Sequence, residues 1–156
     1  MKKFVACNAS KKRWKVNSSK DDEHLIIYSK DIKTVFQAWQ EINSNVQRLT
    51  INIFTEDPVL SINPYFVSNL EVKMNIKEIN FNCYTHDYWL TLILSLCPNI
   101  EKLYFFKLTK EKLKYIAEHL DYVKNIECDF IESDTIEFYN DMRKQRKDIN
   151  TDIKIN

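Results

Sequence analysis

The stretch Ile100-Glu101-Lys102-Leu103-Tyr104-Phe105 decides the fold, because its pattern of apolar and polar residues recurs along the chain. Apolar residues stand at positions 1, 4 and 6, and polar or charged residues stand at positions 2 and 3. The pattern begins at residues 46, 76, 100 and 123, so the intervals are 30, 24 and 23 residues. This spacing predicts a repeat of one short strand and one helical return.

Alternation of side chains along a strand predicts which residues of each unit are buried. Positions 4 and 6 point to one side of the sheet, and position 5 points to the other. The predicted inner pairs are Leu49/Ile51, Ile79/Phe81, Leu103/Phe105 and Ile126/Cys128. The predicted outward residues are Thr50, Asn80, Tyr104 and Glu127.

The segments between the strands carry helical spacing of apolar residues. The four predicted helices cover Ile32 to Ile42, Leu90 to Cys97, Leu113 to Leu120 and Ile136 to Met142. The pattern favours an α/β leucine-rich repeat solenoid arc of about five units, with a parallel sheet on the concave side and helices on the convex side.

Local signals predict how these helices begin and which residues face solvent. Thr109 is the expected N-cap of the third helix, and Ser133 or Asp134 of the fourth. Lys112 and Lys114 are expected to face solvent.

The repeat predicts one domain with irregular ends. We assign residues 1–21 to an irregular N-terminal cap and residues 22–156 to the repeat domain. Leu25 to Ile27 resembles another repeat strand, and Ile153 to Ile155 resembles a terminal edge strand made polar by Lys154 and Asn156. Residues 55–75 exceed the period and predict a loop or an irregular short helix.

Composition excludes several classes of function. The 156 residues include no glycine, which phosphate-cradling loops need, so we expect no nucleotide cofactor. The net charge of +1 offers no general attraction for nucleic acid or an anionic membrane. The four cysteines include no CxxC pair and follow no secretory leader, so we expect reduced thiols and a cytoplasmic or nuclear location.

The helix-to-strand link Leu96-Cys97-Pro98-Asn99-Ile100 resembles the phrase that joins repeats in the leucine-rich region of F-box proteins. The resemblance covers residues 22–156 and is most specific over residues 76–129. It implies the substrate-binding half of a ubiquitin-ligase adaptor, with a ligase substrate as the protein partner. The F-box itself is absent from these residues.

We therefore expect a noncatalytic, monomeric protein–protein recognition module without a cofactor or a metal. Outward aromatic residues on a repeat sheet are typical anchors of a protein interface. The predicted partner-binding residues are Asn80, Tyr84, Tyr104, Phe106 and Glu127.

Two alternatives remain open at the level of sequence. Basic clusters at residues 11–15 and 143–147 would suit contact with nucleic acid. Cys83 and His86 lie close enough in sequence to suggest a small Cys/His enzyme, although no spacing places a base beside the thiol. No spacing supplies the three or four converging ligands of a metal site.

Overall fold

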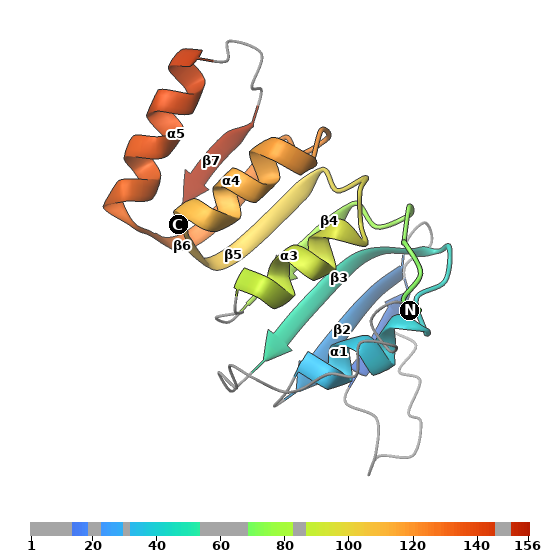
Figure 1. Cartoon of the computed structure of the whole chain (residues 1–156). Helices are drawn as coiled ribbons and strands as arrows, with labels where there is room; N and C mark the ends of the chain where they lie inside the picture. The colour runs from blue at the N-terminus through green and yellow to red at the C-terminus, as the bar shows by residue number, and fades with distance from the viewer. Residues whose placement is uncertain (1–13, 19–22, 30–31, 54–68, 83–86, 146–150) are drawn as a thin grey trace.

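The chain forms an α/β structure around a single sheet, as shown by a computed structural model (Figure 1). The structure describes residues 14–18, 23–29, 32–53, 69–82, 87–145 and 151–156. The elements within these ranges are β1 (Trp14–Ser18), β2 (Glu23–Ser29), α1 (Ile32–Trp39), β3 (Val46–Ile53), β4 (Glu78–Phe81), α3 (Asp87–Ser95), β5 (Lys102–Leu108), α4 (Lys110–His119), β6 (Asn125–Ile131), α5 (Ser133–Gln145) and β7 (Asp152–Ile155).

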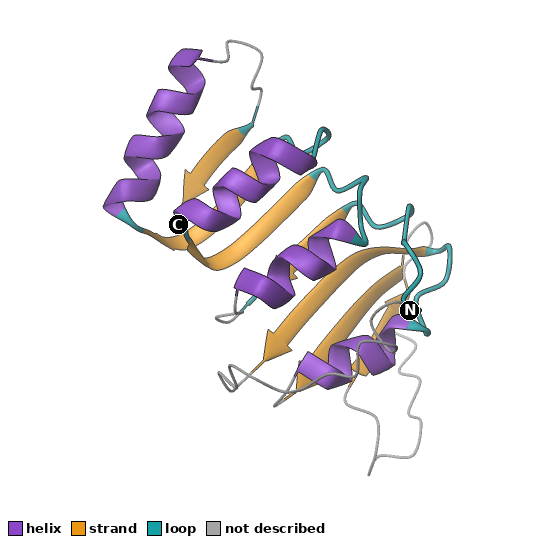
Figure 2. Cartoon of the chain, viewed as in Figure 1, coloured by secondary structure: helices purple, strands orange, loops and turns teal. Residues whose placement is uncertain are grey.

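The seven described strands lie in the sheet in the same order as in the chain, from β1 to β7. β1 pairs with β2 antiparallel, and the five following pairs are parallel. The four described helices lie over one face of this sheet, so the other face carries no described helix (Figure 2).

Strand register confirms the predicted inner pairs. Position 4 forms one row across the sheet through Leu25, Leu49, Ile79, Leu103, Ile126 and Ile153. Position 6 forms a second row through Ile27, Ile51, Phe81, Phe105, Cys128 and Ile155. The rings of Phe81 and Phe105 stack with their centres 5.5 Å apart. Every residue of these rows from β2 to β6 is buried, so the repeated pattern forms the core.

Most of the predicted helical stripes are buried against these rows. Phe36 and Trp39 of α1, Leu90 and Ile93 of α3, and Leu113 of α4 are all at most 1% exposed. The Thr109 side chain accepts a hydrogen bond from Lys112 N, which confirms Thr109 as the N-cap of α4. These helices therefore cover the apolar rows as the sequence predicts.

The last helix begins earlier than predicted. Glu132 O accepts hydrogen bonds from Thr135 N and Ile136 N, so Glu132 is the residue that precedes the first turn of α5. This makes the predicted caps, Ser133 and Asp134, wrong by at least one residue. Thr135 is fully buried while Ile136 is 40% exposed, so the inner stripe of α5 starts at Thr135.

The described part of the N-terminal region is regular. Trp14–Ser18 of β1 pairs along its whole length with Glu23 to Ile27 of β2, where the sequence analysis predicted an irregular cap. Apolar and polar residues alternate from Trp14 to Asn17, which is the strand signal that the prediction missed. The remaining residues of the predicted cap, and most of residues 55–75, lie outside the described ranges.

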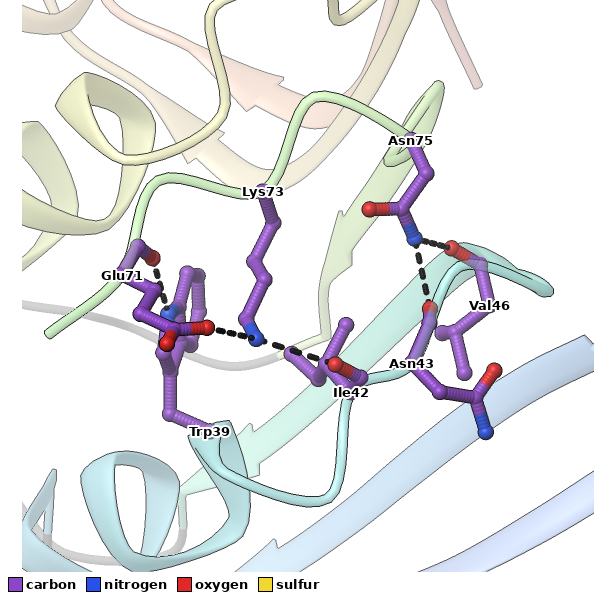
Figure 3. A network of polar contacts seen from close by, with 7 residues as sticks. All are labelled: Trp39, Ile42, Asn43, Val46, Glu71, Lys73 and Asn75. Carbon is purple, nitrogen blue, oxygen red and sulfur yellow. Dashed lines mark hydrogen bonds and ion pairs between the residues drawn. The ribbon is translucent and has the colours of Figure 1, made fainter.

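The segment before β4 is fixed to the segment before β3 by a network of polar contacts (Figure 3). Lys73, which is only 8% exposed, donates from Nζ to Ile42 O at 2.9 Å and lies 3.3 Å from Glu71 Oε2. Trp39 Nε1 donates to Glu71 O at 2.8 Å. These contacts attach the longest unit to the end of α1 through satisfied backbone carbonyls.

Asparagine side chains make a second connection between successive units. Asn75, directly before position 1 of its unit, donates from Nδ2 to Asn43 O at 2.8 Å and to Val46 O at 2.5 Å. Asn99 has the same place in the next unit and donates from Nδ2 to Met74 O at 3.0 Å. The asparagine of the Leu-Cys-Pro-Asn link therefore binds the loop of the preceding unit.

Replacement of Asn75 tests the importance of this connection. Asn75→Ala leaves two carbonyls without their side-chain donor and should lower the free energy of unfolding by about 1–3 kcal/mol. Urea denaturation is the appropriate measurement, with the exposed Asn82→Ala as the matched control. Equal stability of the two variants would contradict a structural role for the Asn75 amide.

Candidate protein-interaction surface

The sheet face opposite the helices is the main candidate surface, and we refer to it as the open face. Because side chains alternate, the residues between the two buried rows point toward this face. Register aligns Thr50, Asn80, Tyr104, Glu127 and Lys154 in a row across it. The structure thus brings together three of the predicted partner-binding residues, Asn80, Tyr104 and Glu127.

The N-terminal part of the open face contains two hydrogen bonds to the side chain of Thr50. His24 Nε2 lies 2.6 Å from Thr50 Oγ1, and Asn80 Nδ2 donates to the same hydroxyl oxygen at 3.3 Å. Thr50 is only 5% exposed. This part of the open face therefore presents a fixed polar surface.

The C-terminal part of the open face is organised around Asp129. The Tyr104 hydroxyl donates to Asp129 Oδ2, and Asn156 Nδ2 donates to Asp129 Oδ1 at 3.4 Å. Partial burial, followed by the hydrogen bond to Asp129 and its charge, raises the pKa of Tyr104 to about 12. Lys102 Nζ lies 3.4 Å from Glu127 Oε1 on the same face. Tyr104 is therefore held in place by Asp129.

Two exposed aromatic rings lie beside this polar group. Phe106 on β5 is 38% exposed and Phe130 on β6 is 56% exposed, and their ring centres are 5.1 Å apart in an edge-to-face arrangement. Both belong to the C-terminal halves of their strands. We refer to them as the Phe106–Phe130 pair.

Phe106 is among the residues predicted from the sequence, whereas Phe130 is not. Alternation from Ile126 and Cys128 assigns Phe130 to the buried side of β6. Its exposure and its contact with Phe106 become visible only in the structure. Tyr84, the remaining predicted partner-binding residue, lies outside the described ranges.

The residues of the two alternative functions are only partly described. Cys83, His86 and residues 11–13 lie outside the described ranges. In the second basic cluster, Arg143 lies over the Tyr139 ring at 5.6 Å and Lys144 lies 4.0 Å from Asp141. Within the described ranges, no group of three histidine, cysteine, aspartate or glutamate residues could hold a metal ion.

The two described cysteines are buried free thiols. Burial strongly raises the pKa of Cys97, although the nearby Lys73 acts in the opposite direction. Burial and then the charge of Asp129 raise the pKa of Cys128. Both thiols are therefore protonated at neutral pH and are poor nucleophiles.

Lys112 is buried, and the prediction that it faces solvent is wrong. Its side chain is 2% exposed, and Nζ donates to Lys107 O at 2.9 Å. Nζ also lies 3.8 Å from Asp87 Oδ1 and 5.9 Å from the centre of the Phe105 ring. The long side chain thus carries its charge across the core from α4 to the first residue of α3. Burial lowers the pKa of Lys112, while the charge of Asp87 opposes this effect.

None of the described helices combines the length and the apolar composition that crossing a bilayer requires. Comparisons with protein-family models, with curated proteins and with solved structures found no match to this chain. The class that the described fold defines is therefore an α/β protein with six sequential parallel strands.

Titration of tyrosine absorbance tests how Tyr104 is held. The tyrosinate signal that is lost in Tyr104→Phe should titrate at about pH 12, because partial burial and then the hydrogen bond to Asp129 raise the pKa of Tyr104. Asp129→Asn should move this component to lower pH, since it removes the acceptor charge. A component that titrates near the ordinary value of 10.0 in the wild type would contradict the contact.

The pH dependence of stability tests the burial of Lys112. Its pKa is lower in the folded than in the unfolded chain, so the unfolded chain binds more protons between that lowered pKa and the ordinary value of 10.5. Across this window the wild type should gain stability relative to Lys112→Met as pH rises, by about 1.4 kcal/mol for each pKa unit of the shift. The gain should be complete above the ordinary value.

Urea denaturation at several pH values up to 10.5 measures this gain. Lys114→Met is the matched control, because Lys114 lies on the same helix with its side chain 61% exposed. The same pH dependence in both variants would show that Lys112 is solvated.

Proposed function

We propose that this chain is a noncatalytic protein-recognition module of the leucine-rich repeat class. The sheet would form the concave side of a solenoid arc and the helices its convex side. The proposal is supported by the sequential parallel strands, by the recurrence of one apolar pattern in register, and by helices on one face of the sheet.

The Phe106–Phe130 pair on the polar open face is the observation that carries this proposal. Exposed aromatic rings supply large contact areas at a low cost in side-chain entropy, and they dominate many protein interfaces. The neighbouring Tyr104–Asp129 contact is already formed without a partner, so little ordering would be needed on binding. We propose that the partner buries the two rings while Asn80, Tyr104 and Glu127 form the surrounding polar rim.

Resemblance to the repeat region of F-box proteins supports a narrower version of this proposal. In this version the open face holds a substrate of a ubiquitin ligase, and a separate component provides the attachment to the ligase. Contact with nucleic acid is disfavoured, because the carboxylates of Glu127 and Asp129 lie on the same face as the exposed rings.

Affinity capture followed by mass spectrometry tests the proposed surface. The double variant Phe106→Ala/Phe130→Ala should reduce recovery of the partner by about tenfold or more, as expected for a pair of interface anchors. The control variant Tyr88→Ala/Tyr122→Ala removes two aromatic rings that are 61% and 58% exposed on other parts of the molecule.

Retention of every partner by both double variants would contradict the proposed binding surface, provided that circular dichroism shows both variants to be folded. Recovery of ligase scaffold subunits together with the partner would support the adaptor version. A stable partner without those subunits would support a recognition module alone.

A further inference from the structure

Within the described part of the chain, β7 is an edge strand of the sheet. Within the described ranges β7 pairs with β6 alone, through bonds that include Asp152 N to Lys124 O at 2.8 Å and Asn156 N to Cys128 O at 2.9 Å. Backbone groups alternate along a strand, so the N–H and C=O groups of Ile153 and Ile155 point away from β6. This edge is a template for another strand.

The apolar core also ends uncovered at this strand. Ile155 is aligned with Cys128, the last fully buried residue of the position 6 row, yet Ile155 is 52% exposed. Ile153, aligned with Ile126, is only partly buried. A strand added at this edge would extend the apolar surface beside Ile153.

The sequence of β7 is complementary to itself in one antiparallel register. If two copies pair about Ile153, Asp152 of each copy lies opposite Lys154 of the other. The same register places Ile153 opposite Ile153 in a mutually hydrogen-bonded pair, with its outward N–H and C=O groups satisfied. Both ion pairs would lie on the open face, where Asp152 and Lys154 are exposed.

Other antiparallel registers lack this match. Pairing about Lys154 would place two ammonium groups directly opposite each other, which is destabilising. Pairing about Ile155 would place Lys154 opposite Asn156, so neither ion pair would form. The charges therefore select the register centred on Ile153.

We propose that a second copy of this chain pairs with β7 in this register, so that one sheet continues across a two-fold symmetric dimer. This inference is independent of the function proposed above, and it replaces the monomer expected from the sequence. The sequence suggests that Lys154 makes this edge strand polar. In the dimer, Lys154 would instead form an ion pair with Asp152 of the second copy. Since β7 has only four residues, the dimer should be of the weak, reversible class.

Sedimentation equilibrium of the full chain over a wide range of concentrations tests this dimer. The wild type should change from the mass of one copy to the mass of two as concentration rises. Lys154→Asp and Asp152→Lys should each weaken dimerisation by about tenfold or more, because each makes both ion pairs repulsive. The double variant Asp152→Lys/Lys154→Asp restores opposite charges and should recover dimerisation.

Two further variants separate this edge from other surfaces. Lys144→Asp makes the same change of charge on an exposed residue of α5 and should leave dimerisation unchanged. Ile155→Pro removes an N–H group that points away from β6 and should weaken the dimer. Circular dichroism verifies that each variant is folded.

Three results would overturn the proposal. The first is a wild type that stays monomeric at every concentration. The second is a dimer that is insensitive to the single charge changes, which would place the interface elsewhere. The third is a charge-swapped double variant that dimerises no better than either single variant.

Discussion

The rest of the structure depends on the register in which the parallel strands stack. Leu103 lies between Ile79 and Ile126, and Phe105 lies between Phe81 and Cys128, so each apolar residue meets its equivalents in the neighbouring units. A shift of one residue would turn both rows to the open face and would bury polar side chains instead. The helices need only cover two continuous apolar rows, which explains why their stripes are short.

Polar contacts hold this register at the amino ends of the strands. The amide of Asn75 binds carbonyl oxygens of the preceding unit, and Asn99 does so one unit later. Lys77 and Lys124 both form ion pairs with Glu101, at 3.4 and 3.2 Å. The exposed ion pairs contribute little to stability, whereas the amides donate to backbone carbonyls of the preceding unit. An asparagine before position 1 thus connects two successive units to the preceding ones, whereas Tyr122 has this place in the unit that starts at Val123.

The sequence predicted those parts of the structure that follow from periodicity. The inner pairs and most helical stripes are confirmed, because alternation and helical spacing directly determine which face a residue occupies. Lys112 was misassigned because burial of its charge depends on Asp87, which only the tertiary structure brings near it. Phe130 was missed because the alternation breaks near the end of β6, where Ile131, aligned with the buried Leu108, packs against the core in its place.

The two ends of the sheet end the repeat in different ways. At the N-terminal end β1 runs antiparallel to β2, so the succession of parallel units is closed by a strand of opposite direction. At the other end β7 keeps the parallel direction and the spacing of the repeat, and its Ile155 has no covering layer. Each unit that stacks on the sheet exposes an equivalent apolar edge for the next unit. A unit at the edge of the sheet must therefore differ from the others or be covered. β1 differs, whereas β7 does not, and this asymmetry is the physical reason to look for a partner at β7.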